Sequence, residues 1–187
     1  MKLYALCDQD MLDAKGVSVE EFVTIAQSHN AEIIQYRNKN ADIAFMKQQL
    51  IKIRKIYDGF LIVNDAYELV EFCDGVHVGQ EDLQAIDQDI VKAVKILRSV
   101  ITSDKILGIS THNEEEVLQA NTMDLNYIGL GAYRGTTTKT DVSTILGDSL
   151  DTIAAHSTHL VAAIGGVKLD DTFEHVTYNV IGSGLLV

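Results

Sequence analysis

The sequence predicts an α/β protein folded as a single (β/α)8 (TIM) barrel, and three observations support this. Eight short apolar segments alternate with helix-like amphipathic stretches along the 187 residues. The apolar segments lack polar alternation, which is typical of parallel strands buried on both faces. Polar residues follow the segments where they end, and a barrel gathers such residues on one rim. An open doubly wound sheet is the alternative fold.

Each predicted strand is a short apolar run. In chain order the strands are Leu3–Cys7, Glu32–Tyr36, Phe60–Val63, Gly75–Val78, Ile106–Ile109, Tyr127–Leu130, Leu160–Ile164 and Asn179–Ile181. The helices expected around them are Ser18–Ser28, Ile43–Ile56, Ala66–Phe72, Gln88–Val100, Asn113–Ala120, Leu146–Ala155 and Leu169–His175. In the second helix Phe45, Leu50 and Ile53 recur at helical spacing, which predicts one face packed on a sheet.

A final helix is expected to be shortened or missing, because few residues follow the last strand. No linker divides the chain, so residues 1–187 are predicted to form one domain. The absent helix should expose an apolar flank, and we expect a homodimer to cover it.

The amino-acid composition limits the cellular location and the kinds of partner that we expect for this chain. Hydrophobic residues make up 47% of the chain, and no apolar run approaches the roughly 20 residues of a membrane span. Asp8 comes too early for a secretory signal, so a cytoplasmic location is expected. The net charge of −12 argues against nucleic-acid binding. Cys7 and Cys73 lack metal-binding spacing and are predicted to be buried thiols.

Two neighbouring strands each lead into a carboxylate. The segment GVHVGQEDL at 75–83 ends its strand just before Asp82, and Phe60–Val63 leads directly into Asn64 and Asp65. Paired carboxylates at one rim suit Mg²⁺, which keeps waters and shares itself with a substrate phosphate. Each Asp alone also has a simpler interpretation, as a turn or cap residue.

Other strand ends add groups suited to phosphate chemistry. They are Asp8, Arg37, Lys39, Gln80, Glu81, Ser110, His112, Thr136, Thr138, Lys139, Gly165, Gly166, Gly182, Ser183 and Gly184. The basic side chains among them can neutralise a pyrophosphate, and the glycine turns let backbone N–H groups approach a second phosphate. His77 lies inside a strand, where we expect it to pack or hydrogen-bond in the core.

Six short motifs follow one another along nearly the whole chain. They are Gln35-Tyr36-Arg37-Asn38-Lys39 (QxRxK), Val63-Asn64-Asp65, GVHVGQEDL, Gly108-Ile109-Ser110-Thr111-His112 (GxSxH), Tyr127-Ile128-Gly129-Leu130-Gly131 leading to Thr136-Thr137-Thr138-Lys139 (YIGxG…TxTK), and Ala163-Ile164-Gly165-Gly166-Val167 (AIGGI). In this order they resemble the motifs of the thiamine phosphate synthase (thiamine phosphate pyrophosphorylase) family.

The resemblance implies a transferase that joins hydroxymethylpyrimidine diphosphate to thiazole phosphate, with release of pyrophosphate, in thiamine biosynthesis. It implies that Asp65 and Asp82 hold Mg²⁺. The residues implied for the pyrimidine diphosphate are Gln35, Arg37, Lys39, Asn64, Ser110 and Lys139, of which Arg37, Lys39, Ser110 and Lys139 are implied to be catalytic. The residues implied for the thiazole phosphate are Thr136, Thr137, Thr138, Gly165 or Gly166, Ile181, Gly182 and Ser183.

The chain departs from the family pattern at Ala132 and Gly135, where proline is usual. Two alternatives therefore stay open. A TenI-like thiazole tautomerase would use His112 as acid and base, but it would not need the charges of Lys39, Asp65, Asp82 and Lys139. A catalytically inactive barrel that binds thiamine precursors is the other.

Overall fold

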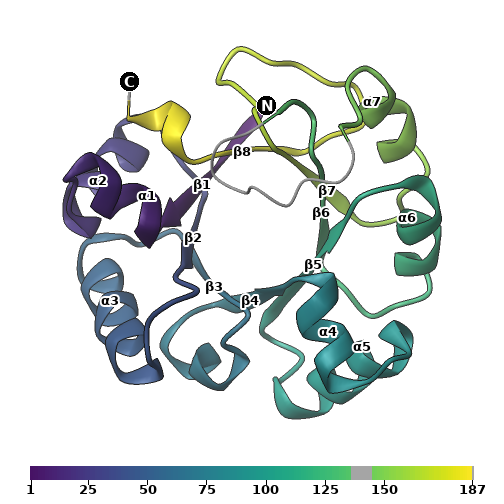
Figure 1. Cartoon of the computed structure of the whole chain (residues 1–187), viewed down its shortest axis with the longest axis horizontal. Coiled ribbons are helices and arrows are strands. Elements are labelled where there is room, and N and C mark those ends of the chain that lie inside the picture. The colour runs from purple at the N-terminus through teal and green to yellow at the C-terminus, as the bar shows by residue number, and fades with distance from the viewer. Residues whose placement is uncertain (136–144, 187) are drawn as a thin grey trace.

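The chain forms a closed barrel of eight parallel strands, as predicted. The computed structural model describes residues 1–135 and 145–186. Strand order follows the sequence from β1 to β8, and β8 pairs with β1 to close the ring. Figure 1 shows this ring from one end, with the helices arranged around its outside. The closed order excludes the open-sheet alternative.

The described elements follow the predicted alternation of strands and helices. The strands are β1 (Lys2–Asp8), β2 (Ile33–Arg37), β3 (Phe60–Asn64), β4 (Gly75–Val78), β5 (Ile106–Thr111), β6 (Tyr127–Gly131), β7 (Leu160–Ile164) and β8 (Tyr178–Ile181). The helices are α1 (Gln9–Lys15), α2 (Val19–Ser28), α3 (Ile43–Ile56), α4 (Gln80–Ile86), α5 (Ile90–Val100), α6 (Glu114–Ala120) and α7 (Ser149–Ala154), with 3-10 helices η1 (Tyr67–Phe72) and η2 (Ser183–Leu185). Every predicted strand is present.

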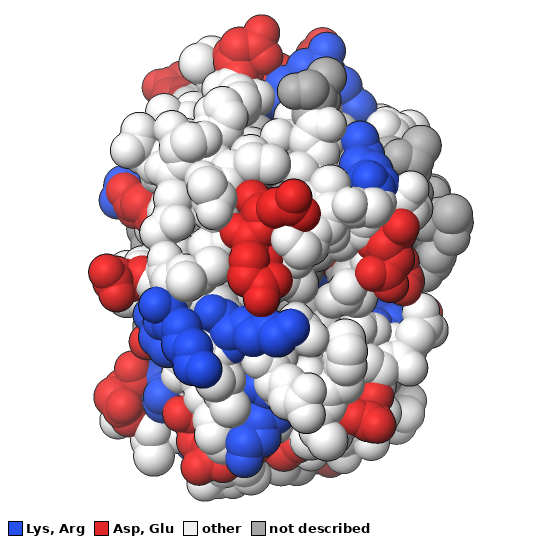
Figure 2. Space-filling model, turned by 90° about the vertical axis from the view of Figure 1, so that its left-hand side faces the viewer, with Lys and Arg blue, Asp and Glu red and all other residues white. Residues whose placement is uncertain are grey.

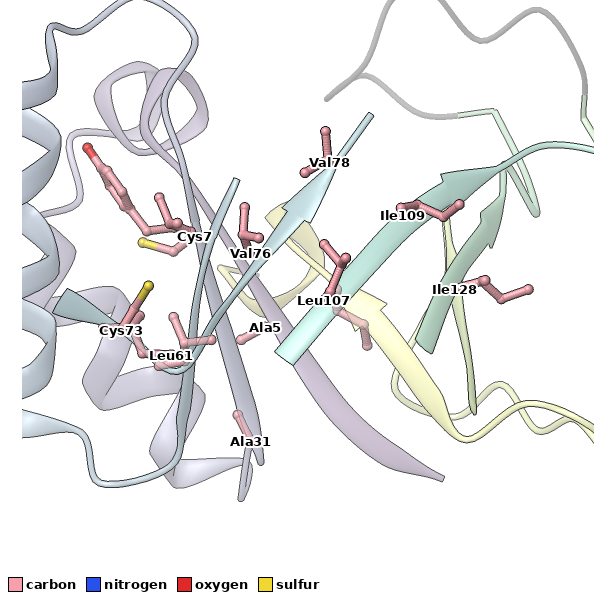
Figure 3. Close-up of a cluster of buried hydrophobic side chains, with 14 of the residues drawn as sticks. Ala5, Cys7, Ala31, Leu61, Cys73, Val76, Val78, Leu107, Ile109 and Ile128 are labelled. Atoms are coloured by element: carbon pink, nitrogen blue, oxygen red, sulfur yellow. The ribbon is translucent and has the colours of Figure 1, made fainter. Parts of the chain in front are cut away.

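Alternate residues of each strand divide between two apolar layers. Side chains that include Tyr4, Ile62 and Val180 fill the barrel interior. The larger layer lies between the sheet and the helices, and Figure 3 shows part of it around Leu61 and Val76. Because successive strand residues point to opposite faces, each strand serves both layers. Polar residues that alternate in step with the interior side chains therefore also point into the barrel, and those near the carboxyl ends of the strands face its mouth.

Both cysteines are buried and free, as predicted. Figure 3 places Cys7 and Cys73 in the outer apolar layer. Burial raises the pKa of each thiol, which favours the neutral form that packs as a small apolar side chain.

Two short helices, α1 and α4, escaped the sequence analysis, because each follows its strand with at most one residue between. The Asp8 side chain caps α1 by accepting a hydrogen bond from the Met11 N–H at 3.0 Å. Gln80 and Asp82, predicted as rim residues, lie in the first turn of α4. Each seven-residue helix is too short to show a clear apolar period.

The helix predicted at Leu169–His175 is wrong, since the chain between β7 and β8 is a loop. Side chains bind the backbone groups that a helix would have used. The Asn179 amide donates to the carbonyls of Lys168 and Asp171, and the Asp151 carboxylate accepts from the Glu174 and His175 N–H groups. Such contacts compete with helical hydrogen bonds.

Two further predictions hold in a modified form. The stretch predicted as the helix Ala66–Phe72 is the 3-10 helix η1. After β8 the described residues contain the single 3-10 turn η2, whose Leu185 is buried. This turn stands where a shortened final helix was expected.

The outer surface carries charges of both signs. Figure 2, which views the molecule from the left-hand side of Figure 1, shows acidic and basic side chains intermingled on that face. None of the helices that the structure describes combines the length and apolarity of a membrane span.

Candidate active site

A cleft opens beside the barrel mouth, at the carboxyl ends of β2, β3 and β4. Its volume is about 460 Å³. The lining residues are Asn38, Lys39, Met46, Asn64, Asp65, Ala66, Tyr67, Glu68, Val78, Asp82, Ala85 and Ile86. Four predicted site residues, Lys39, Asn64, Asp65 and Asp82, therefore share one cavity.

The two carboxylates of the cleft converge on Gly79. A Cβ atom placed on Gly79 would lie 3.1 Å from Asp82 Oδ2 and 3.9 Å from Asp65 Oδ1. The Gly79 N–H donates to Asp65 Oδ1 at 3.1 Å, while the Asn64 amide donates to Asp65 Oδ2. Asp65 has the left-handed backbone angle φ +62°, which turns the chain sharply after β3. Glycine at position 79 leaves the space in which both carboxylates meet.

The electrostatics of this pair favour a bound cation. Burial raises the pKa of Asp65; the Gly79 N–H opposes the shift, and the Asp82 carboxylate adds to it. Lys39 and Arg37 act in the lowering direction but leave the pKa above its usual value. Two nearby carboxylates repel each other, and a cation between them relieves that repulsion.

Within the described ranges, no group of three or more His, Cys, Asp or Glu side chains is arranged to hold a metal ion. A cation held by Asp65 and Asp82 would take its other ligands from water and substrate, which is the habit of Mg²⁺. The donor set consists of hard oxygens and fits that ion.

Arg37 lies at the barrel mouth, where it forms an ion pair with Asp8. Asp8 and Arg37 are register partners on β1 and β2, and their side chains form a buried ion pair. Arg37 Nε is also buried and has no hydrogen-bond partner among the described residues. Buried N–H groups normally have an acceptor, so this one marks a position for an anionic oxygen.

A small hollow of about 20 Å³ continues from the cleft into the barrel. Gln35, Arg37 and Ser110 line it together with Tyr4, His77 and Tyr127. Asn64 lines both cavities, so the cleft and the hollow adjoin.

A chain of hydrogen bonds crosses this hollow. Gln35 Nε2 donates to the Tyr4 hydroxyl at 2.6 Å, and the Tyr4 and Tyr127 hydroxyl oxygens lie 2.8 Å apart. Tyr127 Oη lies 2.9 Å from His77 Nδ1, and His77 Nε2 lies 3.0 Å from Ser110 Oγ. His77 is therefore a hydrogen-bonded core residue, as the sequence indicated.

One direction of this chain gives every hydroxyl hydrogen an acceptor. The Gln35 amide can only donate through its nitrogen, so the Tyr4 oxygen accepts that bond and the Tyr4 hydroxyl donates its own hydrogen bond to the Tyr127 oxygen. Tyr127 then donates to His77 Nδ1, which leaves Nε2–H to donate to Ser110. Burial raises the pKa of both tyrosines, so both hydroxyls stay protonated. The Ser110 hydroxyl can therefore donate its hydrogen to a group at the barrel mouth.

The loop after β5 holds a second polar cluster. Gln80 Nε2 donates to the Ser110 carbonyl at 2.5 Å, which joins α4 to β5. His112 Nδ1 lies 3.0 Å from Glu116 Oε2, and the same oxygen accepts from the His112 N–H. Burial acts to raise the pKa of Glu116, but the bonds from His112 outweigh it and the pKa lies below its usual value.

On the opposite part of the rim, the described residues form mainly backbone turns. Gly165 and Gly166 follow β7 with φ +88° and φ +64°, angles that favour glycine. Gly182 and Ser183 follow β8 at the start of η2. The predicted residues Thr136, Thr137, Thr138 and Lys139 lie outside the described residues.

The sequence analysis missed Tyr4 and Tyr127 as functional candidates. Both have the strand parity of the interior residues, as Gln35 and Ser110 do on β2 and β5. Counting alternate residues along each strand could have assigned both to the barrel interior.

Comparison with known proteins agrees with this geometry. A family model described as "Thiamine monophosphate synthase" matches residues 3–183. The chain is 33% identical to a thiamine-phosphate synthase of Persephonella marina over 90% of this chain and 78% of that protein. It is 36% identical to one of Lawsonia intracellularis over 89% of this chain and 74% of that protein.

Solved structures of other proteins have the same fold as this chain. A thiamine phosphate pyrophosphorylase of Pyrococcus furiosus superposes with a TM-score of 0.76 at 26% identity, covering 97% of this chain and 85% of that one. A tryptophan synthase alpha-subunit of the same organism has a TM-score of 0.65 at 11% identity, covering 99% and 88%, and shares the fold alone.

Fold and relatives together define a (β/α)8-barrel transferase. The chain belongs to the thiamine monophosphate synthase family. Its relatives support the predicted thiamine phosphate synthase function in thiamine biosynthesis.

Proposed function

We propose that this rim joins hydroxymethylpyrimidine diphosphate to thiazole phosphate in a Mg²⁺-dependent reaction that releases pyrophosphate. The observation that carries the proposal is the shared cleft, in which the Asp65 and Asp82 carboxylates adjoin Lys39. A cation site beside a basic side chain suits a diphosphate, which needs both to offset its charge.

The cleft, together with the polar groups that line the hollow beside it, suits the two parts of the pyrimidine substrate. The charged cleft would take the diphosphate, with Asp65 and Asp82 holding the ion and Lys39 facing the phosphate oxygens. Gln35 and Ser110 at the hollow would face the pyrimidine ring and its methylene group. Arg37 would direct Nε–H toward the diphosphate while Asp8 holds its other side.

The reaction needs charge stabilisation more than proton transfer. The bond between the methylene carbon and the diphosphate oxygen breaks, and the diphosphate keeps the electron pair. The thiazole nitrogen then gives its lone pair to the methylene carbon. Bound Mg²⁺ would supply positive charge to the leaving group. Lys39, Arg37 and the Ser110 hydroxyl would stabilise the same developing charge from the protein side.

The His112–Glu116 pair supports a second candidate, the thiazole tautomerase. Glu116 orients the imidazole at the rim, which suits an acid/base residue. Changing His112→Ala separates the candidates: we expect pyrophosphate release to fall by no more than about threefold, since the synthase reaction uses no base. A tautomerase would release no pyrophosphate, and His112→Ala would instead abolish its tautomerisation of the thiazole phosphate precursor.

The test of the proposal is pyrophosphate release from the purified chain given both substrates, with and without Mg²⁺. We expect release that needs both substrates and the ion, and its loss in Asp82→Ala. Glu81→Gln is the matched control, since Glu81 lies in the same turn of α4 but is exposed and does not line the cleft. No release from folded wild-type protein would reject the synthase and leave the tautomerase or the inactive precursor-binding barrel. The cytoplasmic location and the homodimer stay predictions from the sequence.

A further inference from the structure

Arg134, in the loop after β6, contacts the turn that follows β7. Its η1 nitrogen donates to the Gly166 carbonyl at 3.0 Å, and its backbone N–H donates to the Gly165 carbonyl at 2.8 Å. Both carbonyls of the glycine turn are therefore bonded to one residue, through two different groups.

The guanidinium is held in place by a bidentate ion pair. Its η1 and η2 nitrogens lie 2.6 Å and 2.8 Å from the two carboxylate oxygens of Asp171. The guanidinium carbon also lies 4.2 Å from the centre of the Tyr133 ring. Asp171 is itself positioned by the Lys168 N–H at 2.8 Å. Bidentate pairing and stacking together restrict an otherwise flexible side chain.

These bonds determine where the turn's own N–H groups point. In a trans peptide the N–H points opposite to the carbonyl of the same peptide plane. Because Arg134 binds the carbonyls of Gly165 and Gly166, the N–H groups of Gly166 and Val167 point away from Arg134. Neither N–H donates to any residue that the structure describes. Two N–H groups on one side of a turn, with no acceptor among the described residues, form a site for an anionic oxygen.

We propose that Arg134 is a positioning residue that holds the Gly165–Gly166 turn so that its N–H groups bind the phosphate of thiazole phosphate. The inference rests on the proposed function for the identity of the ligand. Two successive glycines with positive φ are the most mobile backbone a turn can have, so an external anchor is needed to keep both peptide planes in one orientation. Arg134 supplies that anchor without touching the ligand.

The test is calorimetric binding of thiazole phosphate to the wild type and to Arg134→Gln. We expect Arg134→Gln to weaken binding about 10-fold, since loss of the anchor frees the turn. Arg134→Lys, which keeps the charge and one donor, should recover part of the affinity. Asp171→Asn, a milder change, should weaken binding about threefold. Binding of pyrophosphate with Mg²⁺ should stay within about twofold of wild type in all three variants.

Arg54→Gln is the matched control. Arg54 η1 also donates to two backbone carbonyls, those of Tyr57 and Gly59, and Arg54 also pairs with a carboxylate, that of Asp74. This second clamp precedes β3 and β4 and so lies at the other end of the barrel. Its loss should lower the melting temperature and leave thiazole phosphate binding unchanged.

The positioning role is overturned if Arg134→Gln lowers the melting temperature as Arg54→Gln does but keeps wild-type affinity for thiazole phosphate. It is also overturned if the folded wild type does not bind thiazole phosphate. If the wild type binds thiazole phosphate but releases no pyrophosphate with both substrates, the proposed function fails, and the positioning role is judged on binding alone.

Discussion

Under the proposed function, the two halves of the rim recognise anions by different means. From β1 to β5 the rim presents side chains, among them Lys39, Asp65 and Asp82, on short connections. From β6 to β8 the residues that the structure describes present backbone turns, and Arg134 there donates to the Gly166 carbonyl. Side-chain sites suit a metal-bound diphosphate, whereas N–H groups of a turn suit a phosphate monoester. If both sites bind as proposed, one barrel separates two phosphate groups by giving each half of its rim a different chemistry.

The largest expected effect comes from the carboxylate pair. Asp65→Ala or Asp82→Ala should lower pyrophosphate release about 1000-fold, because charge on the leaving group would lose its stabilisation. Thiazole phosphate binding should not change, since that ligand belongs to the other half. Release and calorimetry on the same protein preparations check both points. Wild-type turnover in either variant would remove the metal assignment.

The next largest effect is expected at the Gly165–Gly166 turn, in the half of the rim that runs from β6 to β8. In Gly166→Ala the new Cβ would lie 2.8 Å from Arg134 Cβ, at a residue with φ +64°. We expect a loss of about 1–3 kcal/mol in the free energy of unfolding, together with weaker thiazole phosphate binding. Gly16→Ala is the control, since its φ is +63° but no atom lies within 4 Å of its added Cβ. Equal effects of both changes on binding would contradict the assignment of the turn.

A smaller effect is expected at the hydrogen-bond chain between the halves. Tyr127→Phe removes the hydroxyl between Tyr4 and His77, so Ser110 loses its fixed orientation. We expect turnover to fall about 10-fold and stability by about 1–3 kcal/mol. Tyr36→Phe, whose hydroxyl binds Gln9 outside the barrel, should lower stability alone. Unchanged turnover in Tyr127→Phe would limit the chain to a structural role.

The smallest expected effect is the pH dependence of the Arg134–Asp171 pair. The hydrogen bond from Arg134 lowers the pKa of Asp171 from its usual 3.8. A carboxyl with a lowered folded-state pKa stabilises the fold above 3.8, and that contribution disappears as pH falls through the folded-state pKa. Arg134 is partly exposed, so the effect is small.

Melting temperatures of the wild type and Asp171→Asn at a series of pH values measure this contribution. The two curves should differ at neutral pH and converge in acid. A difference that persists at the lowest pH would show that the pair stabilises by packing and not by charge.

The sequence predicted the site residues of the rim from β1 to β5 more fully than the contacts of the rim from β6 to β8. Asp65 and Asp82 could be predicted because carboxylates that follow two adjacent strands within a few residues gather at one rim. The pairing of Asp8 with Arg37 depends on the register of β1 and β2, which no local pattern reveals. Arg134 and Asp171 lie 37 positions apart, so their contact required the folded loops.

The wrong helix at Leu169–His175 has the same kind of cause. Its pattern is compatible with a helix, but Asn179 and Asp151 bind its backbone groups from other elements. Long-range side-chain contacts outweigh local propensity there. The barrel itself was predictable because eight buried apolar strands leave few alternatives.

The most direct test of the two-half rim is a competition measurement by calorimetry. Thiazole phosphate is titrated into the wild-type chain alone, and then into the chain saturated with Mg²⁺ and pyrophosphate. We predict that its affinity stays within about threefold, since the two anions occupy separate halves of the rim. Competition, in which saturating pyrophosphate abolishes thiazole phosphate binding, would contradict the account.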